Sequence, residues 1–457
     1  DYVAAGGTLN FTGTAGETQT IDVTVNGDTR LESDETFTVD LSNPTNSVTI
    51  SDAQGVGTIE NDDAASYSID DVTAVETDSG TTTFTFTVTL NEAVAGGSSV
   101  DYTTNDGTAT TADTDYVAAS GTLNFTGTAG ETRTIDVTVN GDTTLETDET
   151  FTVDLTNPTN SVTISDAEGV GTIENDDAAS YSIDDVTAAE TDSGTTTFTF
   201  TVTLNEAVAG GSSVDYTTND GTATTADSDY VAAAGTLNFA GTAGETQTID
   251  VTVTSDTKLE ADETFTVDLS NSTNSVTISD AQGLGTIEND DAASYSIDNV
   301  SAVETDVGTT FTFTVTLDEA VAGGSSVDFT TNNGTATTAD SDYVAASGTL
   351  NFTGTVGETQ TIDVTVTGDT RLEVDETFTV DLSNATNAVT ISDAQGVGTI
   401  ENDDAASYSI DDVTANEGDA GTTTFTFTVT LNEAVAGGSS VDYTTKEDSA
   451  TTAEGDY

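Results

Sequence analysis

The stretch Thr83–Leu90 reads TFTFTVTL, so Phe84, Phe86, Val88 and Leu90 alternate with threonine. Alternation with a period of two predicts a β-strand that buries its apolar face and exposes its polar face. Threonine suits the outer face because its β-branched side chain fits a pleated surface. The same alternation recurs along the chain, and no segment shows the period of an amphipathic helix.

Similar runs fill residues 66–177, where turn signals such as Gly96-Gly97 and Asn157-Pro158 separate them. Seven short strands within about 110 residues predict an all-β fold: a Greek-key, immunoglobulin-like sandwich of two antiparallel sheets. The expected strands cover residues 67–76, 82–91, 98–105, 121–126, 132–140, 149–156 and 161–173.

This unit is repeated along the chain. The string ENDDAASYSID begins at Glu60, Glu174, Glu288 and Glu401, with spacings of 114, 114 and 113 residues. A period this long is a whole domain, because solenoid units have only about 20–50 residues. The sequence therefore predicts sandwiches of one type arranged in tandem along a line.

We expect complete domains at 66–177, 180–291 and 294–404. A half-domain with the last four strands is expected at 1–63, and one with the first three strands at 407–457. Neither half can close a two-sheet core alone. We expect each half to be completed within a longer polypeptide, with head-to-tail complementation between identical chains as the alternative.

Composition excludes several classes of function. The 457 residues include 82 Asp and Glu against 5 Lys and Arg, which gives a formal net charge of -77. Such a chain lacks the basic surface that binds nucleic acid or anionic membranes. No apolar run is long enough to insert into a bilayer. The chain has no Cys, His, Met or Trp, which leaves mainly carboxylates, hydroxyls and amides for chemistry, and these suit hard cations such as calcium.

The acidic residues are expected to converge. In an antiparallel sandwich the first, third, fifth and seventh strands end at one pole, which we call the acidic pole. Crowded carboxylates repel one another and need cations or raised pKa values. The alternative, an acidic surface adapted to high salt, would spread the charge evenly. The residues expected at this pole of 66–177 are Glu76, Asp113, Asp115, Asp142, Glu146, Asp148, Glu149, Asp176 and Asp177.

Three segments resemble the Calx-beta domain, a calcium-binding sandwich of sodium–calcium exchangers and many large bacterial surface proteins. They read DGTATTADTDY at 106–116, GDTTLETDETF at 141–151 and GTIENDD at 171–177. The resemblance extends over every repeat. It implies Ca²⁺ ligation by Glu76, Asp115, Asp142, Glu146, Glu149, Asp176 and Asp177, with the carbonyl of Thr144 as a backbone ligand.

Two departures from the family pattern stand out. Gly141 replaces a first aspartate, and Asn175 replaces an acid, so two or three calcium ions per complete domain are expected. The equivalent ligands in the other complete domains are Glu190, Asp229, Asp256, Glu260, Asp290 and Asp291, then Glu304, Asp342, Asp369, Glu373, Asp403 and Asp404. The half-domains contribute Asp1, Asp28, Glu32, Asp62 and Asp63 at the start, and Glu417 and Asp456 at the end.

The leading functional hypothesis is a calcium-rigidified stalk in an extracellular filament or giant bacterial surface adhesin. Only Ala178-Ala179-Ser180 separates two domains, so the acidic pole of one domain should meet the base of the next. Partners would be neighbouring repeats of the same or an identical chain. A calcium-sensing regulatory unit and a carbohydrate- or surface-binding module remain alternatives. Enzymatic use is not expected, because the paired carboxylates that could serve a glycosidase recur in every repeat.

Overall fold

The computed structural model describes residues 1–453, and within that range it contains strands and no helix. No segment there could cross a membrane as a helix. The predicted all-β sandwich fold is confirmed. In the sandwich 66–177, one sheet has the order β10-β3-β5-β8 and the other β4-β11-β9-β6-β7. Their bounds are β3 Ser66–Ile69, β4 Val72–Val75, β5 Gly80–Leu90, β6 Ser98–Asp106, β7 Ser120–Phe125, β8 Glu131–Gly141, β9 Glu149–Thr156, β10 Thr163–Ile164 and β11 Glu168–Glu174.

The first and seventh expected strands are each divided between the two sheets, which corrects the continuous strands 67–76 and 161–173. β3 pairs antiparallel with β5, whereas β4 pairs parallel with β11 in the opposite sheet. The crossing lies at Asp70-Asp71. The Asp70 carboxylate accepts a hydrogen bond from the backbone N–H of Thr87 (2.5 Å), and Asp71 accepts one from Val170 N–H (2.8 Å). These side chains replace ladder hydrogen bonds where the strand changes sheet.

Aromatic side chains fill the space between the two sheets. Phe84, Phe86 and Phe151 have no exposed surface. The Phe151 ring stacks on Tyr116 at a centroid distance of 4.5 Å and meets Phe86 edge-on at 5.9 Å. Tyr67 is also fully buried, and its hydroxyl shares a 2.6 Å hydrogen bond with Ser98. The threonines of the alternating strands face outward, as the pattern predicts.

The other complete sandwiches repeat this topology, with the sheet orders β17-β14-β12-β19 and β13-β20-β18-β15-β16 in the next one. Their strands are β12 Ser180–Ile183, β13 Val186–Ala189, β14 Gly194–Leu204, β15 Ser212–Asp220, β16 Ala234–Phe239, β17 Thr246–Ser255, β18 Glu263–Ser270, β19 Thr277–Ile278 and β20 Gln282–Glu288, then β21 Ser294–Ile297, β22 Val300–Val303, β23 Thr309–Leu317, β24 Ser325–Asn333, β25 Ser347–Phe352, β26 Thr359–Val366, β27 Glu376–Ser383, β28 Thr390–Ile391 and β29 Gln395–Glu401.

The two ends form fewer strands than expected. Residues 1–63 contain only β1 (Glu35–Asp40) and β2 (Gln54–Ile59), where four strands were expected. The described part of 407–457 contains β30 (Tyr408–Ile410) and β31 (Val429–Leu431), where three were expected. The cause is the missing pairing partners. In a complete sandwich β7 pairs with β6 and β8 pairs with β5, and the segment 1–63 has no equivalent of β5 or β6.

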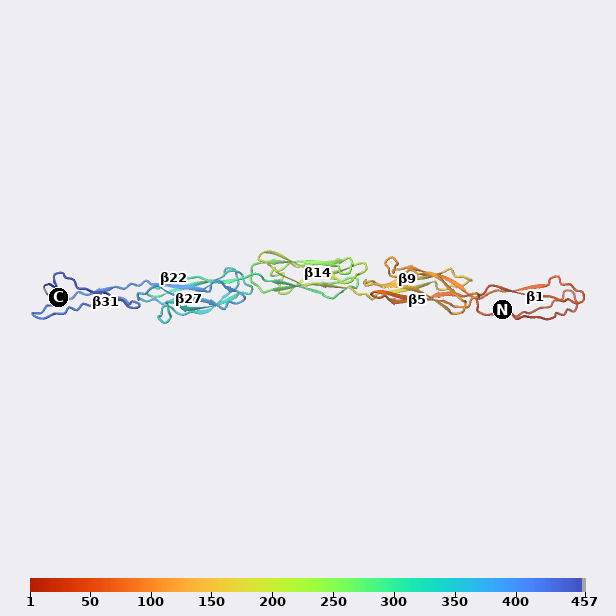
Figure 1. Ribbon diagram of the computed structural model, residues 1–457, viewed down its shortest axis with the longest axis horizontal. Helices are drawn as coiled ribbons and strands as arrows, with labels where there is room; N and C mark the ends of the chain where they lie inside the picture. The colour runs from red at the N-terminus through yellow and green to blue at the C-terminus, as the bar shows by residue number, and fades with distance from the viewer. Residues whose placement is uncertain (454–457) are drawn as a thin grey trace.

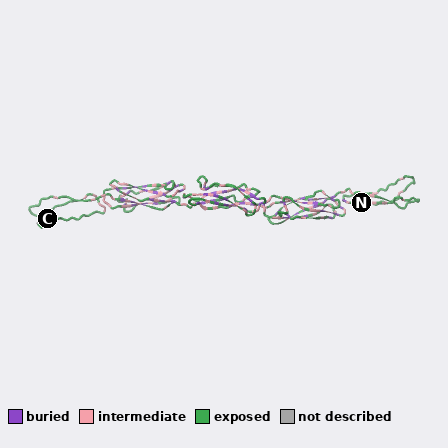
Figure 2. Cartoon of the chain, turned by 90° about the horizontal axis from the view of Figure 1, so that it is seen from above, coloured by how far each residue is buried: buried purple, intermediate pink, exposed green. Residues whose placement is uncertain are grey.

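The sandwiches follow one another in a line, with the two end segments at opposite extremes (Figure 1). Buried residues concentrate inside the three complete sandwiches, whereas both ends are mostly exposed (Figure 2). Each complete sandwich therefore has its own core.

Phe151 is the best test of this core. Truncation of a fully buried Phe costs about 3–5 kcal/mol of folding free energy. We expect Phe151→Ala to shift one unfolding transition of the full chain to lower temperature in scanning calorimetry. Val75→Ala, at a side chain that is 42% exposed, is the control and should leave the trace unchanged. An unaltered trace for Phe151→Ala would contradict the packing described.

Candidate metal centre at the acidic pole

Two parallel strands bring the first set of carboxylates together. β4 and β11 run side by side, and the backbone N–H of Glu76 donates to Glu174 O at 3.2 Å. The residue after β4 therefore lies beside the tail that follows β11. Carboxylate oxygens of Glu76, Asp176 and Asp177 all lie within 4.8 Å of one another. We call this group the inner cluster.

A second set joins two connecting loops. Carboxylate oxygens of Asp115, Glu146 and Glu149 lie within 4.8 Å of one another, and we call this group the outer cluster. Asp115 is held in place because its carboxylate accepts a hydrogen bond from Thr110 N–H at 2.6 Å. The next residue, Tyr116, is anchored by its stacking on Phe151 in the core. The core thus positions this side of the site.

The charge of Asp142 acts on both clusters. Burial raises the pKa of Glu76 to about 7, and the charges of Asp142 and Asp177 add to that effect. Burial and the charge of Asp142 also raise the pKa of Glu146. Since one carboxylate acts on both clusters, the loops that the topology predicts at one pole form a single acidic group. Their role as metal ligands stays a prediction.

Asn175 has a structural role that the sequence did not reveal. Its side-chain oxygen accepts a hydrogen bond from Glu146 N–H at 3.0 Å, and its side-chain nitrogen donates to Asp177 O at 3.0 Å. A carboxylate could accept but not donate, so an amide is required here. The same pair of hydrogen bonds is made by Asn61, Asn289 and Asn402.

Gly141 lies in close contact with the loop after β4, although the domain 180–291 has Ser255 at the equivalent position, where its hydroxyl donates to Glu190 O at 2.6 Å. A Cβ atom at this position would lie 1.8 Å from the carbonyl oxygen of Thr77, in the loop after β4. The backbone of the inner cluster therefore packs where the family pattern would place an aspartate. Gly368 is equally tight, since a Cβ there would lie 1.7 Å from Thr305 O.

The other complete domains reproduce the two clusters and the segment 1–63 the outer one, with three ligand candidates that were not predicted. Glu35, Glu263 and Glu376 correspond to Glu149; burial raises the pKa of Glu263 and Glu376 to about 7, with the charges of Asp229 and Asp342 as the next causes. Burial also raises the pKa of Glu304 to about 7, and further causes are the charges of Asp369, Glu373, Asp404 and Asp403. Carboxylate oxygens also lie within 4.8 Å of one another in the groups Glu190-Asp290-Asp291, Asp229-Glu260-Glu263 and Asp1-Glu32-Glu35.

The remaining predicted ligands lie as follows. Asp256 is near the inner cluster of its domain, because its charge raises the pKa of Glu190 after burial does. In the first half-domain, burial and then the charges of Asp62 and Asp28 raise the pKa of Asp63. Glu417 is exposed, and Asp456 lies outside the described residues.

The donor set fits a hard cation. Glu76, Glu190 and Glu304 are only 9%, 8% and 7% exposed. Among the described residues, one buried carboxylate oxygen of Asp177, and likewise of Asp291 and Asp404, has no hydrogen-bond partner. A buried, unpartnered carboxylate is costly unless it is protonated or bound to a cation. Calcium takes several carboxylate and carbonyl oxygens, which is what this pole offers.

Comparison with known proteins supports the assignment of the fold family. The profile described as the Calx-beta domain matches residues 1–72, 60–177, 174–286 and 288–404. The chain belongs to the Calx-beta domain family. No match is found among curated proteins.

Solved structures similar to this Calx-beta chain include two two-domain fragments. "CBD12 from CALX1.2" is 19% identical over 48% of this chain and 98% of that one, with a TM-score of 0.24. "Calcium binding domain CBD12 of CALX1.1" is 23% identical over 45% and 79%, with a TM-score of 0.23. The apo form of the Calx CBD1 domain is 27% identical over 25% and 100%, with a TM-score of 0.23.

Three of the five basic residues in the chain occupy one position in the loop that carries Glu146 or its equivalent. Each pairs with that glutamate: Arg371 lies 2.9 Å from Glu373, Arg30 3.3 Å from Glu32, and Lys258 contacts Glu260. In the Calx-beta domain 66–177 the same position is Thr144. This domain therefore has no tethered cation in its acidic pole, so its clusters depend most on protons or metal.

Stability without metal should fall as pH rises. The glutamates whose pKa is about 7 in the folded chain have a pKa near 4.3 when unfolded. Their protonation stabilises the folded state fully below about pH 4.3, and this contribution is lost as pH rises through about 7. We expect the melting temperature in chelator to be higher at pH 5 than at pH 8.

Glu190→Gln is the informative variant for this effect, because it removes one titrating group at a buried position. It should raise the melting temperature at pH 8 in chelator and reduce the pH dependence. Asp136→Asn, on an outward strand position, is the control. A melting temperature that rises from pH 5 to pH 8 in chelator would be inconsistent with raised pKa values at this pole.

Proposed function

We propose that this tandem Calx-beta chain is a calcium-rigidified stalk of an extracellular filament or giant bacterial surface adhesin, with no catalytic role. The observation that carries the proposal is the position of the acidic pole. The sandwiches form a linear array (Figure 1), and acidic residues of one sandwich lie at its junction with the next, where Asp290 and Asp291 line a hollow together with Glu319. Near-identical repeats supply length, which is the useful property of a stalk.

Carboxylates of two successive domains face each other at these junctions. Burial raises the pKa of Asp177, and the charge of Glu206 in the next sandwich is among the further causes. Glu319 acts likewise on Asp291, and Glu433 on Asp404. A hollow at the junction between the second and third complete sandwiches is lined by Asp192, Thr257, Asp290, Asp291, Ala292 and Glu319.

Bound calcium would act on both sides of the junction. It would supply the buried carboxylates with a counter-ion and remove the repulsion between Asp177 and Glu206. Repulsion between facing charges favours bending at the junction, and neutralising those charges removes that effect. Calcium binding and a straight, stiff array are therefore linked by the same residues.

Calcium should stabilise the chain strongly. A site filled at about 1,000 times its dissociation constant adds about 4 kcal/mol of unfolding free energy. We expect thermal unfolding of the full chain to move to higher temperature with calcium than with chelator. Sodium chloride at equal ionic strength is the control for screening. If sodium and calcium gave the same melting temperature, the acidic pole would be a solvated surface and the stalk would not be calcium-dependent.

The missing tethered cation gives a second test within the same chain. We expect Thr144→Arg to weaken calcium binding to the domain 66–177 by about tenfold, which is about 1.4 kcal/mol, because a positive charge close to Glu146 competes with the ion. Isothermal titration calorimetry on the full chain measures the loss of one class of sites. Thr144→Gln, long but uncharged, is the matched control. Equal calcium affinities in the two variants would show that the ions do not bind near this loop.

A further inference from the structure

One leucine in a loop of each domain packs into the core of the following domain and not into its own. Leu145 lies in the loop between β8 and β9, among acidic and threonine residues, yet it is only 8% exposed. It belongs to the apolar core of the following sandwich, together with Val208 and Phe239. Leu31 enters the core of the sandwich 66–177 in the same way, and Leu259 enters that of 294–404.

Two backbone hydrogen bonds fix the register of this contact. Leu145 N–H donates to Ala207 O at 2.9 Å, and Ala209 N–H donates to Leu145 O at 3.0 Å. Leu145 thereby forms a parallel bridge to Val208. All four junctions repeat this geometry: Leu31 with Ala93 and Ala95, Leu259 with Ala320 and Ala322, and Leu372 with Ala434 and Ala436, at distances of 2.8–3.0 Å.

The receiving loop is built at the base of each sandwich, and we call it the socket. In the domain 66–177 the socket is centred on Val94, which is 2% exposed. Val94 N–H donates to Gly127 O at 3.0 Å. Gly127 has a φ of +91°, and a Cβ there would lie 2.1 Å from Val94 O, so a side chain at this position is excluded.

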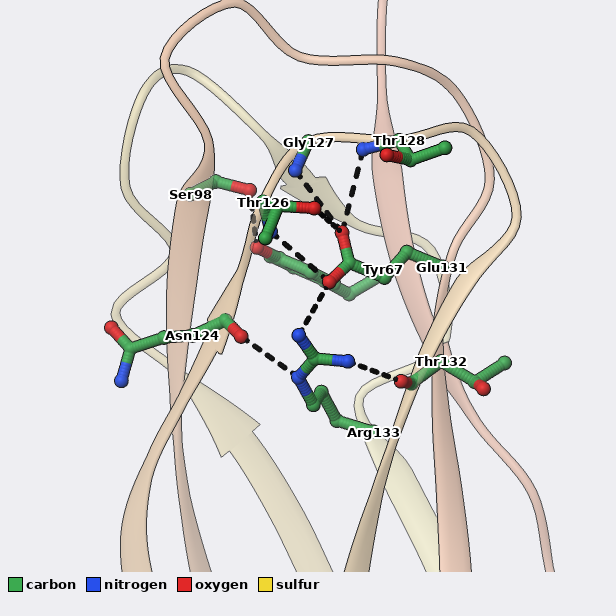
Figure 3. Close-up of polar contacts among 9 residues, drawn as sticks. All are labelled: Tyr67, Ser98, Asn124, Thr126, Gly127, Thr128, Glu131, Thr132 and Arg133. Carbon is green, nitrogen blue, oxygen red and sulfur yellow. Dashed lines mark hydrogen bonds and ion pairs between the residues drawn. The ribbon is translucent and has the colours of Figure 1, made fainter.

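A fully paired glutamate holds the socket in shape (Figure 3). Glu131 accepts hydrogen bonds from the backbone N–H groups of Thr126 and Gly127, both at 3.1 Å. Arg133 lies 2.6 Å from the same carboxylate. Glu131, unlike the carboxylates of the acidic pole, therefore has partners from its own base, and the socket that it holds presents an apolar contact without needing an ion.

We propose that the loop leucine and the socket form a metal-independent docking interface that accepts the same loop of another domain of this kind and fixes the orientation of successive domains. The partner is a second Calx-beta domain with a leucine directly before the cluster glutamate. The leucine fills the apolar part of the socket, and the two backbone hydrogen bonds set its register. This goes beyond the proposed function, since calcium adds stiffness to an orientation that the leucine already sets.

The test measures the distance between two neighbouring sandwiches in the full chain. The chain has no native cysteine, so Thr83→Cys and Thr197→Cys, at exposed positions of β5 and β14, allow selective spin labelling. Pulsed electron–electron double resonance then gives the distribution of distances between the two labels in chelator and in calcium. We expect the parent distribution to be narrow in chelator and to narrow further in calcium, and the Leu145→Ser distribution to be at least twofold broader than that of the parent in each condition.

Two control variants separate docking from folding. Val117→Ser removes an apolar side chain that is 52% exposed near the same pole, and it should leave the distribution narrow. Leu145→Met keeps an apolar side chain of similar size and should also remain narrow. Leu145→Ser should in addition lower the melting temperature of the sandwich 180–291, whose core it enters, by at least about 4 °C.

Each outcome decides between the two proposals. A narrow distribution for Leu145→Ser would overturn the docking interface. A parent chain that is broad in chelator and narrow only in calcium would also overturn metal-independent docking, while supporting calcium rigidification. A parent equally narrow in both, with broadening in Leu145→Ser, would support docking and count against calcium as the source of stiffness.

Discussion

The constraint on which the rest of the structure depends is the crowding of carboxylates at one pole of every sandwich. An antiparallel two-sheet fold brings alternate strand ends to the same pole, and here those ends and loops are acidic. Glu76 is nearly buried, and one oxygen of Asp177 has no hydrogen-bond partner. Such a group can be relieved by a proton, by a tethered basic side chain or by a metal ion. The chain shows raised pKa values in every complete repeat and tethered cations at three positions.

The two poles of a sandwich have complementary chemistry. The acidic pole supplies the projecting Leu145 and the unsatisfied carboxylates, whereas the base supplies a socket whose Glu131 is already paired. An interface of this head-to-tail kind leaves one unused surface at each end of the array, so each added domain offers the same surface again. The linear arrangement in Figure 1 therefore follows from the difference between the acidic pole and the base of each sandwich.

Alternation in TFTFTVTL and its equivalents predicted the sandwich, the recurring string ENDDAASYSID predicted the repeat, and acids at alternate strand ends predicted the acidic pole. The prediction missed the change of sheet at Asp70-Asp71, although the inward positions shift phase there, from Tyr67 and Ile69 to Val72 and Ala74. The amide of Asn175 seemed to be a lost ligand, although it joins Glu146 to Asp177 through hydrogen bonds that only the fold brings together. The signal for Leu145 was present: a leucine recurs at the same position of this acidic loop, as Leu31, Leu145, Leu259 and Leu372.

The choice between calcium and a salt-adapted surface depends on where the carboxylates lie. Screening acts through solvent over about 8 Å at physiological ionic strength. A carboxylate oxygen that water does not reach, such as that of Asp177, gains little from it and requires a direct partner. In the domain 66–177 the loop has Thr144 where other repeats have a basic residue, so a proton or a metal ion is needed to neutralise the carboxylates there. Above the pKa of about 7 that burial and charge give Glu76, the proton is lost, and this is the pH range in which the proposed calcium ion would add most to the stability of the pole.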